Sequence, residues 1–496
     1  MSAEPTLTQE DLLPAGIATD REAAPARELR LRIALGDFER AARSLRDGGA
    51  RFVTLCAAER PERSVLGVFA LRGRLIALRA PVEDVAPWSS IGTWWPAARS
   101  AEGELVERSP ISPLLRPDPP RAALSGPDAD RVERDVEGID VFALPYGPIR
   151  SGVFEAIQFL IETGGEDVPR LHTRIGFKHR GLEERMRGMD VDRGTYVAER
   201  VAGIASVAWA TAYAQAVERA LGVEPPQRTQ RWRAVYAELE RIANHLDVIA
   251  KEAETTALFV GQARFQIHKE NVLRLQAAFT GSRFARGAIV PGGVRENGRV
   301  DLDELLAVLD AFERDLRRDR RLFLRTASMT DRLIGTGHLD RALLEAYGAV
   351  GPLARGSGLA TDARHERPYG DYRRLGLEVM TAEEGDAMAR IDVRFDEIAE
   401  STRILRQATD QLRRRDGELR IPLPAGAGSA FGWSEAPQGE LVVWVEVADG
   451  HLENVHIAAP DLRNWAIFDH AFPADVLTDF AFIEHSFGLT PAGADR

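Results

Sequence analysis

Cysteine sets the first limit on the chemistry that this sequence can perform. The chain of 496 residues contains a single cysteine, Cys56. An internal disulfide is therefore excluded, and so is any iron–sulfur, zinc or nickel site that needs several thiolates from this chain. The remaining candidates for chemistry are histidines and clusters of arginine with carboxylates.

These candidates favour structural roles when each is taken with its neighbours in the sequence. His245 lies in LERIANHL, a helical segment, where we expect a buried or interface histidine rather than a ligand. His451 and His456 fall on a predicted hairpin and are expected to form a surface pair. Arg355 and Asp362 share a segment whose glycines favour a tight loop, and we expect an ion pair there.

Composition excludes several classes of function. With 64 basic and 76 acidic residues, the net charge is −12, which argues against nucleic acid as a partner. The acidic N-terminus, MSAEPTLTQEDLL, has no apolar core and does not resemble a signal peptide, so we expect a cytoplasmic location. The glycine-rich GGVREN (292–297) does not follow the strand-to-helix pattern of a phosphate loop, which argues against nucleotide binding.

Helices must position most of these side chains. Residues 196–221 predict a central buried helix, since small residues dominate it and the 17 residues between Arg200 and Glu218 carry no charge. Apolar residues at spacings of three and four predict further helices. Their ranges are 227–254, 263–281, 300–326 and 386–415. Strand patterns at both ends of the chain add sheets, so we predict an α+β fold around an antiparallel helical bundle.

The chain divides into four predicted parts. Residues 1–27, rich in Ala, Pro and acidic residues, predict a disordered leader. Residues 28–108 predict a small α+β domain, with a helix after Asp37. Residues 109–139 are rich in proline and predict an extended linker. Residues 140–496 form the main domain.

Several motifs then occur in a family-specific order. They are YGPIRSGVFEAIQF (146–159), GFKHRGLEERM (176–186), ERVAGIASVAWATAYAQAVE (199–218), LERIANHL (239–246), GAIVPGGVREN (287–297), GPLARGSGLATDARHERPY (351–369), SEAPQGELVVW (434–444) and HSFGLTPAGADR (485–496). Together they resemble the large subunit of group 4 membrane-bound [NiFe] hydrogenases of the formate hydrogenlyase type, and the D subunit of respiratory complex I. The N-terminal domain resembles the complex I C subunit, which hydrogenlyase large subunits carry as a fusion.

The metal ligands of that family are missing. The resemblance implies four thiolates, two from an RxCGxC motif and two from a C-terminal DPCxxC motif. The matching positions here are Ala202, Ala205, Thr490 and Gly493. We therefore expect no metal and no cofactor on this chain, and no hydrogenase activity by the usual route. Trp209 stands where the active family has histidine, a change that fills a cavity with apolar atoms.

The resemblance also implies proton-relay or cavity residues. The candidates are Glu183, Arg180, His179, Arg150, Arg355 and Asp362. Glu183 matches a family glutamate that moves protons, which requires a pKa raised toward neutrality. We favour the alternative, in which Glu183 pairs with an arginine and fixes its loop. His179 is expected to cap a helix or to donate a hydrogen bond in the core.

Complex I holds a quinone through a histidine and a tyrosine, and neither has a counterpart here. Arg150 stands at the histidine position and Gly203 at the tyrosine position. The resemblance still implies a peripheral subunit on the inner face of the cell membrane. Its expected partners are a small iron–sulfur subunit, which holds the cluster, and multi-spanning membrane subunits. Its expected role is structural or coupling.

An alternative function follows from the same resemblance. The chain could bind a quinone or another substrate in a remodelled cavity, where the neighbouring cluster reduces it. An open polar cavity between Arg150, Glu183, Gly203 and Arg355 would favour that function. A cavity filled by Trp209 and its neighbours would favour a scaffold.

Overall fold

A computed structural model describes residues 12–82, 88–108, 113–114, 141–150, 156–295, 301–413 and 417–496. The chain forms two compact units, and each is described by itself. Residues 1–132 with 345–348 make the first unit, and the rest of the chain makes the second. The predicted α+β class is confirmed, because sheets and helices occur in both units.

A five-stranded sheet forms the first unit, in the order β1-β2-β5-β4-β3. Its strands are β1 (Thr19–Glu22), β2 (Glu28–Ile33), β3 (Arg51–Ala58), β4 (Ser64–Leu71) and β5 (Arg74–Pro81). β2 and β5 run parallel, and the other neighbours are antiparallel. Cys56 is buried in β3.

The predicted disordered leader is wrong for residues 12–27. β1 pairs with β2, and Leu12 and Ile17 are buried against the sheet, so apolar burial orders this segment. Residues 1–11 lie outside the described part. The predicted proline-rich linker, 109–139, also lies outside it, except for the two-residue strand β7 (Pro113–Leu114).

Helices α1 (Phe38–Asp47) and α2 (Ala98–Arg108) complete the first unit. α1 begins where the sequence predicts, but the Asp37 carboxylate does not cap it. That carboxylate accepts a hydrogen bond from Arg40 instead, at 2.9 Å. Phe38 is fully buried and meets Trp88 edge to face, with ring centroids 5.3 Å apart, which anchors α1.

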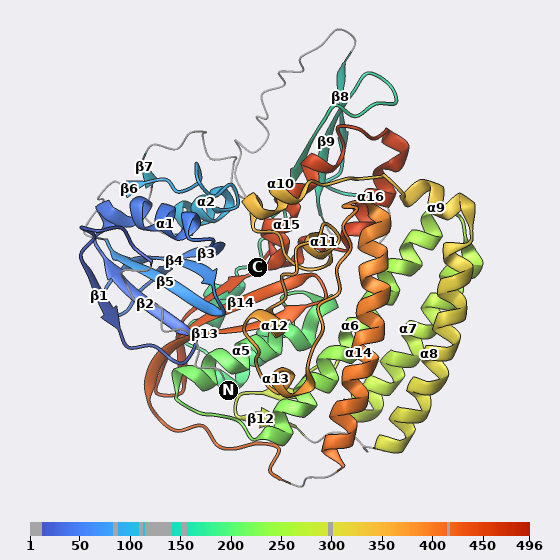
Figure 1. The fold of residues 1–496 in the computed structure, drawn as a ribbon. Coiled ribbons are helices and arrows are strands. Elements are labelled where there is room, and N and C mark those ends of the chain that lie inside the picture. The colour runs from blue at the N-terminus through green and yellow to red at the C-terminus, as the bar shows by residue number, and fades with distance from the viewer. Residues whose placement is uncertain are drawn as a thin grey trace. The chain divides into compact units, whose positions relative to one another are not determined.

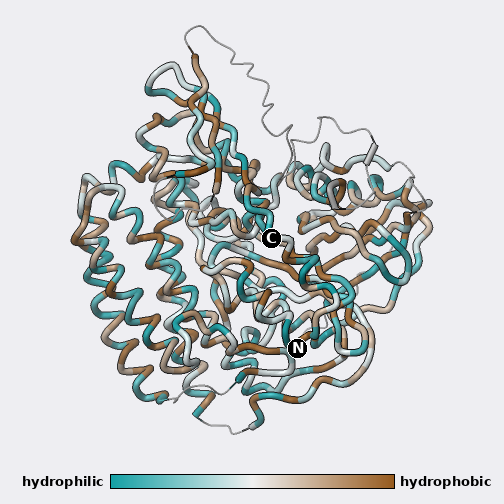
Figure 2. Tube along the Cα trace, turned by 180° about the vertical axis from the view of Figure 1, so that it is seen from behind, coloured by the Kyte–Doolittle hydropathy of each residue, from teal (hydrophilic) through white to brown (hydrophobic). Residues whose placement is uncertain are grey.

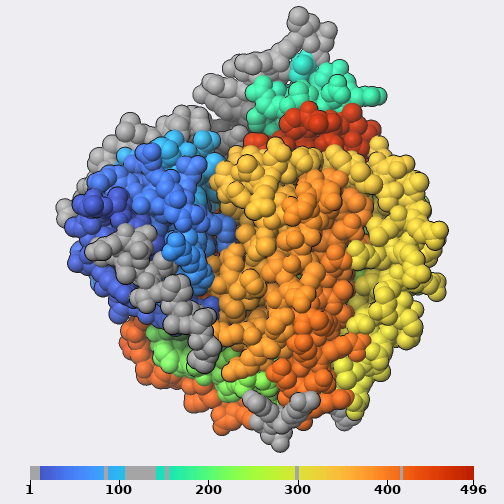
Figure 3. All heavy atoms as spheres, viewed as in Figure 1, coloured from blue at the N-terminus to red at the C-terminus, as the bar shows by residue number. Residues whose placement is uncertain are grey.

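Four long helices dominate the second unit (Figure 1). They are α6 (Gln227–Thr255), α7 (Phe259–Thr280), α8 (Leu302–Leu324) and α14 (Ala387–Leu412). Figure 1 shows them side by side, and apolar and polar residues alternate along them in Figure 2. Figure 3 shows the outer faces of α8, in yellow, and α14, in orange. All four lie close to their predicted ranges, because a 3.6-residue apolar period marks each helix.

The predicted central helix is not continuous. It consists of α4 (Val191–Ala198), a 3-10 turn at Gly203–Ala205 and α5 (Ser206–Ala220). Between α4 and the turn the chain leaves the helical conformation, and Ala202 is extended, with φ −138° and ψ 122°. Tertiary hydrogen bonds explain the break. The carboxylate of Glu199 accepts from Gly287 N, and that of Glu240 accepts from the first turn of α5.

The described part of the second unit contains two three-stranded sheets, besides the short pair of β11 (Ile289–Val290) and β12 (Gly293–Val294). β13 (Ala427–Ala436), β14 (Gly439–Ala448) and β15 (His451–Ala458) form an antiparallel meander that packs on α5. Gly432 permits this contact, because a Cβ there would overlap the backbone of α5 at Ala212. β8 (Phe142–Tyr146), β9 (Gln158–Thr163) and β10 (Arg170–Arg174) form the other antiparallel sheet. Among the described residues, none of the helices combines the length and apolar composition that a bilayer crossing requires.

Candidate functional site

Arg180 joins the two segments that carry the missing ligand positions. The first motif is the segment with Ala202 and Ala205, and the second, C-terminal motif is the segment with Thr490 and Gly493. Arg180 precedes the short helix α3 (Leu182–Met186), and its guanidinium donates to the carbonyl oxygens of Val201 at 2.7 Å and Ala492 at 2.5 Å. It also donates to the carbonyl of Asp495, at 3.2 Å. Because Val201 precedes Ala202 and Ala492 precedes Gly493, the motif of Ala202 and Ala205 lies beside the C-terminal one. The sequence resemblance predicts this juxtaposition.

Apolar side chains fill the space around the first motif. Ala202 and Ala205 are each 2% exposed and belong to one hydrophobic cluster with Trp209, which is 1% exposed. Trp209 lies on α5, which follows the motif directly. The Trp209 ring therefore contributes to a packed core at this place.

The carboxylate of Asp461 occupies the space beside the second motif. Thr490 N donates to Asp461 Oδ1 at 3.2 Å, and the Thr490 hydroxyl accepts from Ala492 N at 3.2 Å. A Cβ on Gly493 would overlap the Asp461 carboxylate and would lie 2.7 Å from the Ala459 Cβ. The four positions offer no thiolate, and position 493 has no room for a side chain. These residues do not fit a four-thiolate nickel–iron group.

Glu183 fixes the loop, as the favoured interpretation predicts. Its Oε1 accepts from Ile457 N at 2.7 Å and from Arg496 Nε at 3.2 Å, and the Glu183 side chain is buried. His456 Nδ1 lies 3.4 Å from the same oxygen. His456 is buried, so the predicted surface pair with the exposed His451 is wrong.

His179 and Arg150 lie apart from that cluster. His179 is exposed, so the predicted core hydrogen bond is wrong, and no side chain caps the helix that follows, α3. Arg150 pairs with both carboxylate oxygens of Glu484, at 2.9 and 2.8 Å, and lies 5.3 Å from the centroids of the Tyr146 and Phe159 rings. Burial opposes the charge of Arg150, but Glu484 outweighs that effect and raises the arginine pKa.

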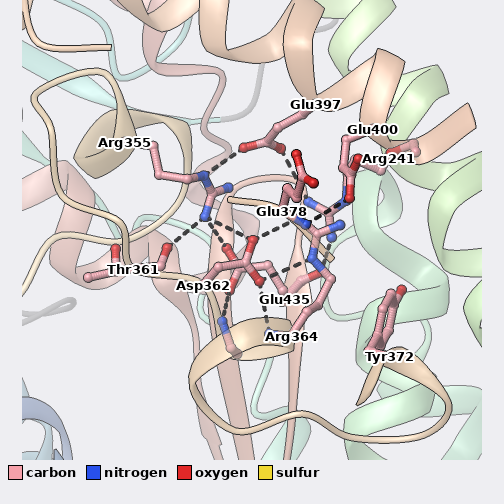
Figure 4. Close-up of polar contacts among 12 residues, drawn as sticks. Arg241, Arg355, Thr361, Asp362, Arg364, Tyr372, Glu378, Glu397, Glu400 and Glu435 are labelled. Atoms are coloured by element: carbon pink, nitrogen blue, oxygen red, sulfur yellow. Dashed lines mark hydrogen bonds and ion pairs between the residues drawn. The ribbon is translucent and has the colours of Figure 1, made fainter. Parts of the chain in front are cut away.

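A buried ionic network surrounds Arg355 (Figure 4). Arg355 is fully buried and donates to Glu397 at 2.6 Å and to Glu435 at 2.8 Å. Asp362 lies 3.4 Å away, so the predicted Arg–Asp pair exists. Arg364 is the closer partner of Asp362, at 2.7 Å. Arg355 ends the short helix α11 (Pro352–Arg355) and thus joins it to α14 and β13, which carry the two glutamates.

The network continues through Glu238 on α6. Arg364 Nη1 donates to Glu238 at 3.0 Å, and the hydroxyls of Tyr372 and Ser401 each donate to the same carboxylate at 2.6 Å. Burial opposes ionisation of Glu238, but the positive charges of Arg364 and Arg241 prevail and lower its pKa. Glu238 is therefore a buried, satisfied carboxylate.

His245 is the core histidine that the sequence predicts. Its Nε2 lies 2.8 Å from Glu397, and its Nδ1 lies 3.2 Å from Arg394. Complete burial lowers the His245 pKa to about 4, although Glu397 acts in the opposite direction. The imidazole is therefore neutral at pH 7.

Sequence reasoning missed most of the network. Glu238 and Arg241 were not singled out, although with His245 they recur at spacings of three and four within the apolar face of α6. Ionisable residues in an apolar stripe were the available signal. Glu397 and Glu435 gave no local signal, because their partners lie far away in the sequence.

Several known proteins are similar to this chain in sequence or in fold. A profile for the family described as "Respiratory-chain NADH dehydrogenase, 49 Kd subunit" matches residues 260–422. The carbon monoxide-induced hydrogenase of Rhodospirillum rubrum is 30% identical over 361 residues, which cover 70% of this chain and 97% of that protein. A D-type subunit of NADH-quinone oxidoreductase from Anaeromyxobacter sp. (strain K) is 33% identical, over 64% of this chain and 86% of that protein.

Two further comparisons are more limited. Formate hydrogenlyase subunit 5 of Escherichia coli (strain K12) is 27% identical over 71% of this chain, and the match spans 63% of that protein, less than two thirds of it. A chain from the "Structure of the membrane-bound sulfane sulfur reductase (MBS), an archaeal respiratory membrane complex" superposes with a TM-score of 0.68 and 24% identity, over 72% of this chain and 99% of that chain. That likeness concerns the fold. On these matches, the chain belongs to the family of the respiratory-chain NADH dehydrogenase 49 kDa subunit and the related membrane-bound hydrogenases.

Proposed function

We propose that this chain is a subunit of a membrane-associated, complex I-like or hydrogenase-like oxidoreductase and holds no nickel–iron centre of its own. Its role is structural or coupling, beside an iron–sulfur subunit that carries the cluster. Peripheral attachment to the inner face of the membrane would come from multi-spanning partner subunits. The related proteins support the type of assembly, since their names are those of hydrogenases and quinone oxidoreductases.

Packing at the four ligand positions is the main support for the proposal that this chain holds no metal centre. The four ligand positions lie beside Trp209 and Asp461, in space that protein atoms fill. A side chain at position 493 would have to displace both the Asp461 carboxylate and Ala459. Close packing at these positions supports the proposal that no nickel–iron group is held there.

The alternative function, reduction of a quinone or another substrate in a remodelled cavity, has less support. The polar side chains that would line such a cavity are engaged elsewhere. Arg150 pairs with Glu484, Glu183 accepts from Arg496, and Arg355 is fully buried in its network.

Metal analysis tests the first part of the proposal. The assembly should be purified from detergent-solubilised membranes, and its nickel and iron measured per copy of this chain. We expect iron from the partner's cluster and no stoichiometric nickel. About one nickel per chain, retained in a Cys56→Ser variant, would overturn the proposal. Nickel that this variant loses would mark binding at Cys56 and leave the degenerate site metal-free.

Co-purification tests the second part. An affinity tag on this chain should recover an iron–sulfur protein and multi-spanning membrane proteins in fixed ratios from a detergent extract. A tag on a variant with a disrupted fold, such as Gly432→Trp, serves as the control for nonspecific recovery. Recovery of the tagged wild-type chain alone, as a stable monomer, would contradict a role in an assembly.

A further inference from the structure

A small cavity lies beside the first degenerate motif, on the side of α6 and α7. Its volume is about 90 Å³, and Gly203 and Ile204 of the 3-10 turn form part of its wall. Leu239, Ala243 and Leu273 provide apolar surface. Three polar side chains also line it, namely Glu240, Asn244 and Gln276. The residues that line this cavity do not belong to the Arg355 network.

Glu240 joins the cavity to the start of α5. One of its oxygens accepts from Val207 N at 2.7 Å, and the other accepts from Ala208 N at 3.0 Å. These two amides lie in the first turn of the 15-residue helix α5, where backbone N–H groups have no intrahelical acceptor. The Glu240 carboxyl therefore caps α5 from a neighbouring helix.

The charge of Glu240 is poorly compensated. Burial raises its pKa to about 8, and the two backbone N–H groups and Arg241 offset burial in part. Arg241 itself donates to Glu435 O at 2.6 Å and lies 3.4 Å from Glu238. Its charge is thus shared with another carboxylate. At neutral pH the protonated form of Glu240 therefore predominates, and the ionised form becomes populated as the pH rises through about 8.

Two acceptors in the same wall have no donor within the described residues. The buried carbonyl oxygens are Asn244 Oδ1 and Gln276 Oε1. Gln276 is 2% exposed, and its amide nitrogen already donates to Tyr236 O at 3.4 Å. Buried carbonyl oxygens that lack a donor are costly, so something in the cavity must donate to them.

Water fits these requirements better than a cation. A cavity of this volume exceeds the space that one water needs, and its polar wall offers two to four partners. Lys269 and Arg283 also line the cavity and would repel a metal or ammonium ion. Lys269 pairs with Asp247 at 2.6 Å, and Arg283 pairs with Glu270 at 2.6 Å. Lys251 also pairs with Asp247, at 3.2 Å, and Arg274 also pairs with Glu270, at 2.9 Å, so these two ion-pair clusters carry a net positive charge.

We propose that this cavity holds ordered water, donating to Asn244 and Gln276, and that through this water Glu240 exchanges a proton with bulk solvent. On uptake, a proton from solvent forms an O–H bond with one carboxylate oxygen, and on release it returns to water. A protonated carboxyl is a weaker acceptor than a carboxylate, so uptake weakens the cap on α5. The proton state of Glu240 thereby acts on the chain beside Ala202 and Ala205. This inference is independent of the assembly to which the chain belongs.

Infrared spectroscopy of the full chain tests the proposal directly. Protein labelled with ¹³C at the glutamate carboxyl groups should be titrated across neutral and alkaline pH. We expect a protonated-carboxyl band that disappears with a midpoint near the Glu240 pKa of about 8. The same band should be absent from Glu240→Gln. The band should shift as soon as the protein is transferred to D₂O. A band that is absent at neutral pH, or that stays unshifted in D₂O, would overturn the proposal.

A matched variant tests whether the water in the cavity, rather than the Glu240 carboxyl alone, is needed for proton exchange. Ala243 lines the cavity and makes no hydrogen bond to Glu240. Ala243→Leu therefore fills the space and leaves the two hydrogen bonds from α5 to Glu240 in place. We expect the Glu240 band to persist in this variant, with its titration midpoint raised and its exchange in D₂O slowed at least several-fold. Unchanged exchange and an unchanged midpoint would refute the role of the water. The wild-type measurement needs no variant and remains decisive if either substitution impairs folding.

Discussion

Replacement of Arg355 by methionine tests the buried network most directly. Arg355 is fully buried and faces three carboxylates, with donor–acceptor distances of 2.6 Å to Glu397 and 2.8 Å to Glu435, and 3.4 Å to Asp362. Methionine fills similar space but carries no charge and no donor. The three carboxylates would then share the remaining arginines, and Glu397 would lose its closest positive charge.

The expected loss follows from burial. Removal of one partner from a buried ion pair costs about 3–5 kcal/mol, because the other charge is left uncompensated. Arg420→Met is the matched control, since Arg420 donates to both oxygens of Asp192 at 2.9 Å, yet the two side chains are 40% and 42% exposed. An exposed pair contributes about 0–1 kcal/mol. The two arginine-to-methionine changes should therefore differ by several-fold in their effect on stability.

The effect of Arg355→Met should also depend on pH. Burial opposes ionisation of Glu397, but Arg355 and the His245 hydrogen bond outweigh it and hold the Glu397 pKa well below its ordinary value. A carboxylate with a lowered pKa stabilises the fold above its unfolded-state pKa, and this stabilisation is lost as pH falls through the folded-state value. The variant lacks this contribution. The gap between wild type and variant should be largest at neutral pH and narrow in acid.

Urea unfolding followed by far-ultraviolet circular dichroism measures both effects, since most of the helix belongs to the second unit. Each protein should be unfolded at neutral pH and again at a mildly acidic pH where it remains folded. An Arg355→Met loss within about 1 kcal/mol of the Arg420→Met loss would refute the assignment of the network as a buried, charge-balanced cluster. So would a gap that widens in acid.

Three further changes probe single features. Trp209→Ala should lower the free energy of unfolding by about 3–5 kcal/mol in urea, because the ring is 1% exposed and leaves a cavity. The wild-type chain should lose about 3 kcal/mol through His245 as pH falls from its unfolded-state pKa of 6.5 to its folded-state pKa of about 4, and His245→Gln should remove that part of the slope. Gly432→Ala should prevent the sheet from packing on α5 and lower the yield of folded protein, whereas Gly450→Ala, at a surface turn with free space around its Cβ, should fold with a modest loss.

The long helices could be predicted because each carries its own signal. The segment 386–415 predicts α14 (Ala387–Leu412), and the glycine at 281 ends α7 in a left-handed conformation as expected. The hairpin turn at Asp449 and Gly450 also follows local chemistry, since both residues have positive φ. In these places backbone preference and apolar period agree with the tertiary fold.

Other features depend on contacts that no local pattern reveals. The segment 199–205 is rich in small residues and favours a helix, but Glu240 accepts from Val207 N and Ala208 N, which are free of helical bonds only because the helix is broken there. The ion pairs of Arg355 join residues 42 and 80 positions apart along the chain. Spacing cannot predict such partners. The likeness of residues 28–108 to the complex I C subunit stays a prediction.

The hydrogen bonds of Arg180 show how the segments at 201–205 and 490–495 are held together without a metal ion between them. The guanidinium donates to backbone carbonyl oxygens of both motifs, and every residue type presents the same carbonyl. These hydrogen bonds therefore require no particular side chain at position 202. Glu183 likewise accepts from a backbone amide and from Arg496, neither of which involves a ligand position. The backbone contacts of Arg180 and Glu183 therefore hold these loops in place without any thiolate at the four positions.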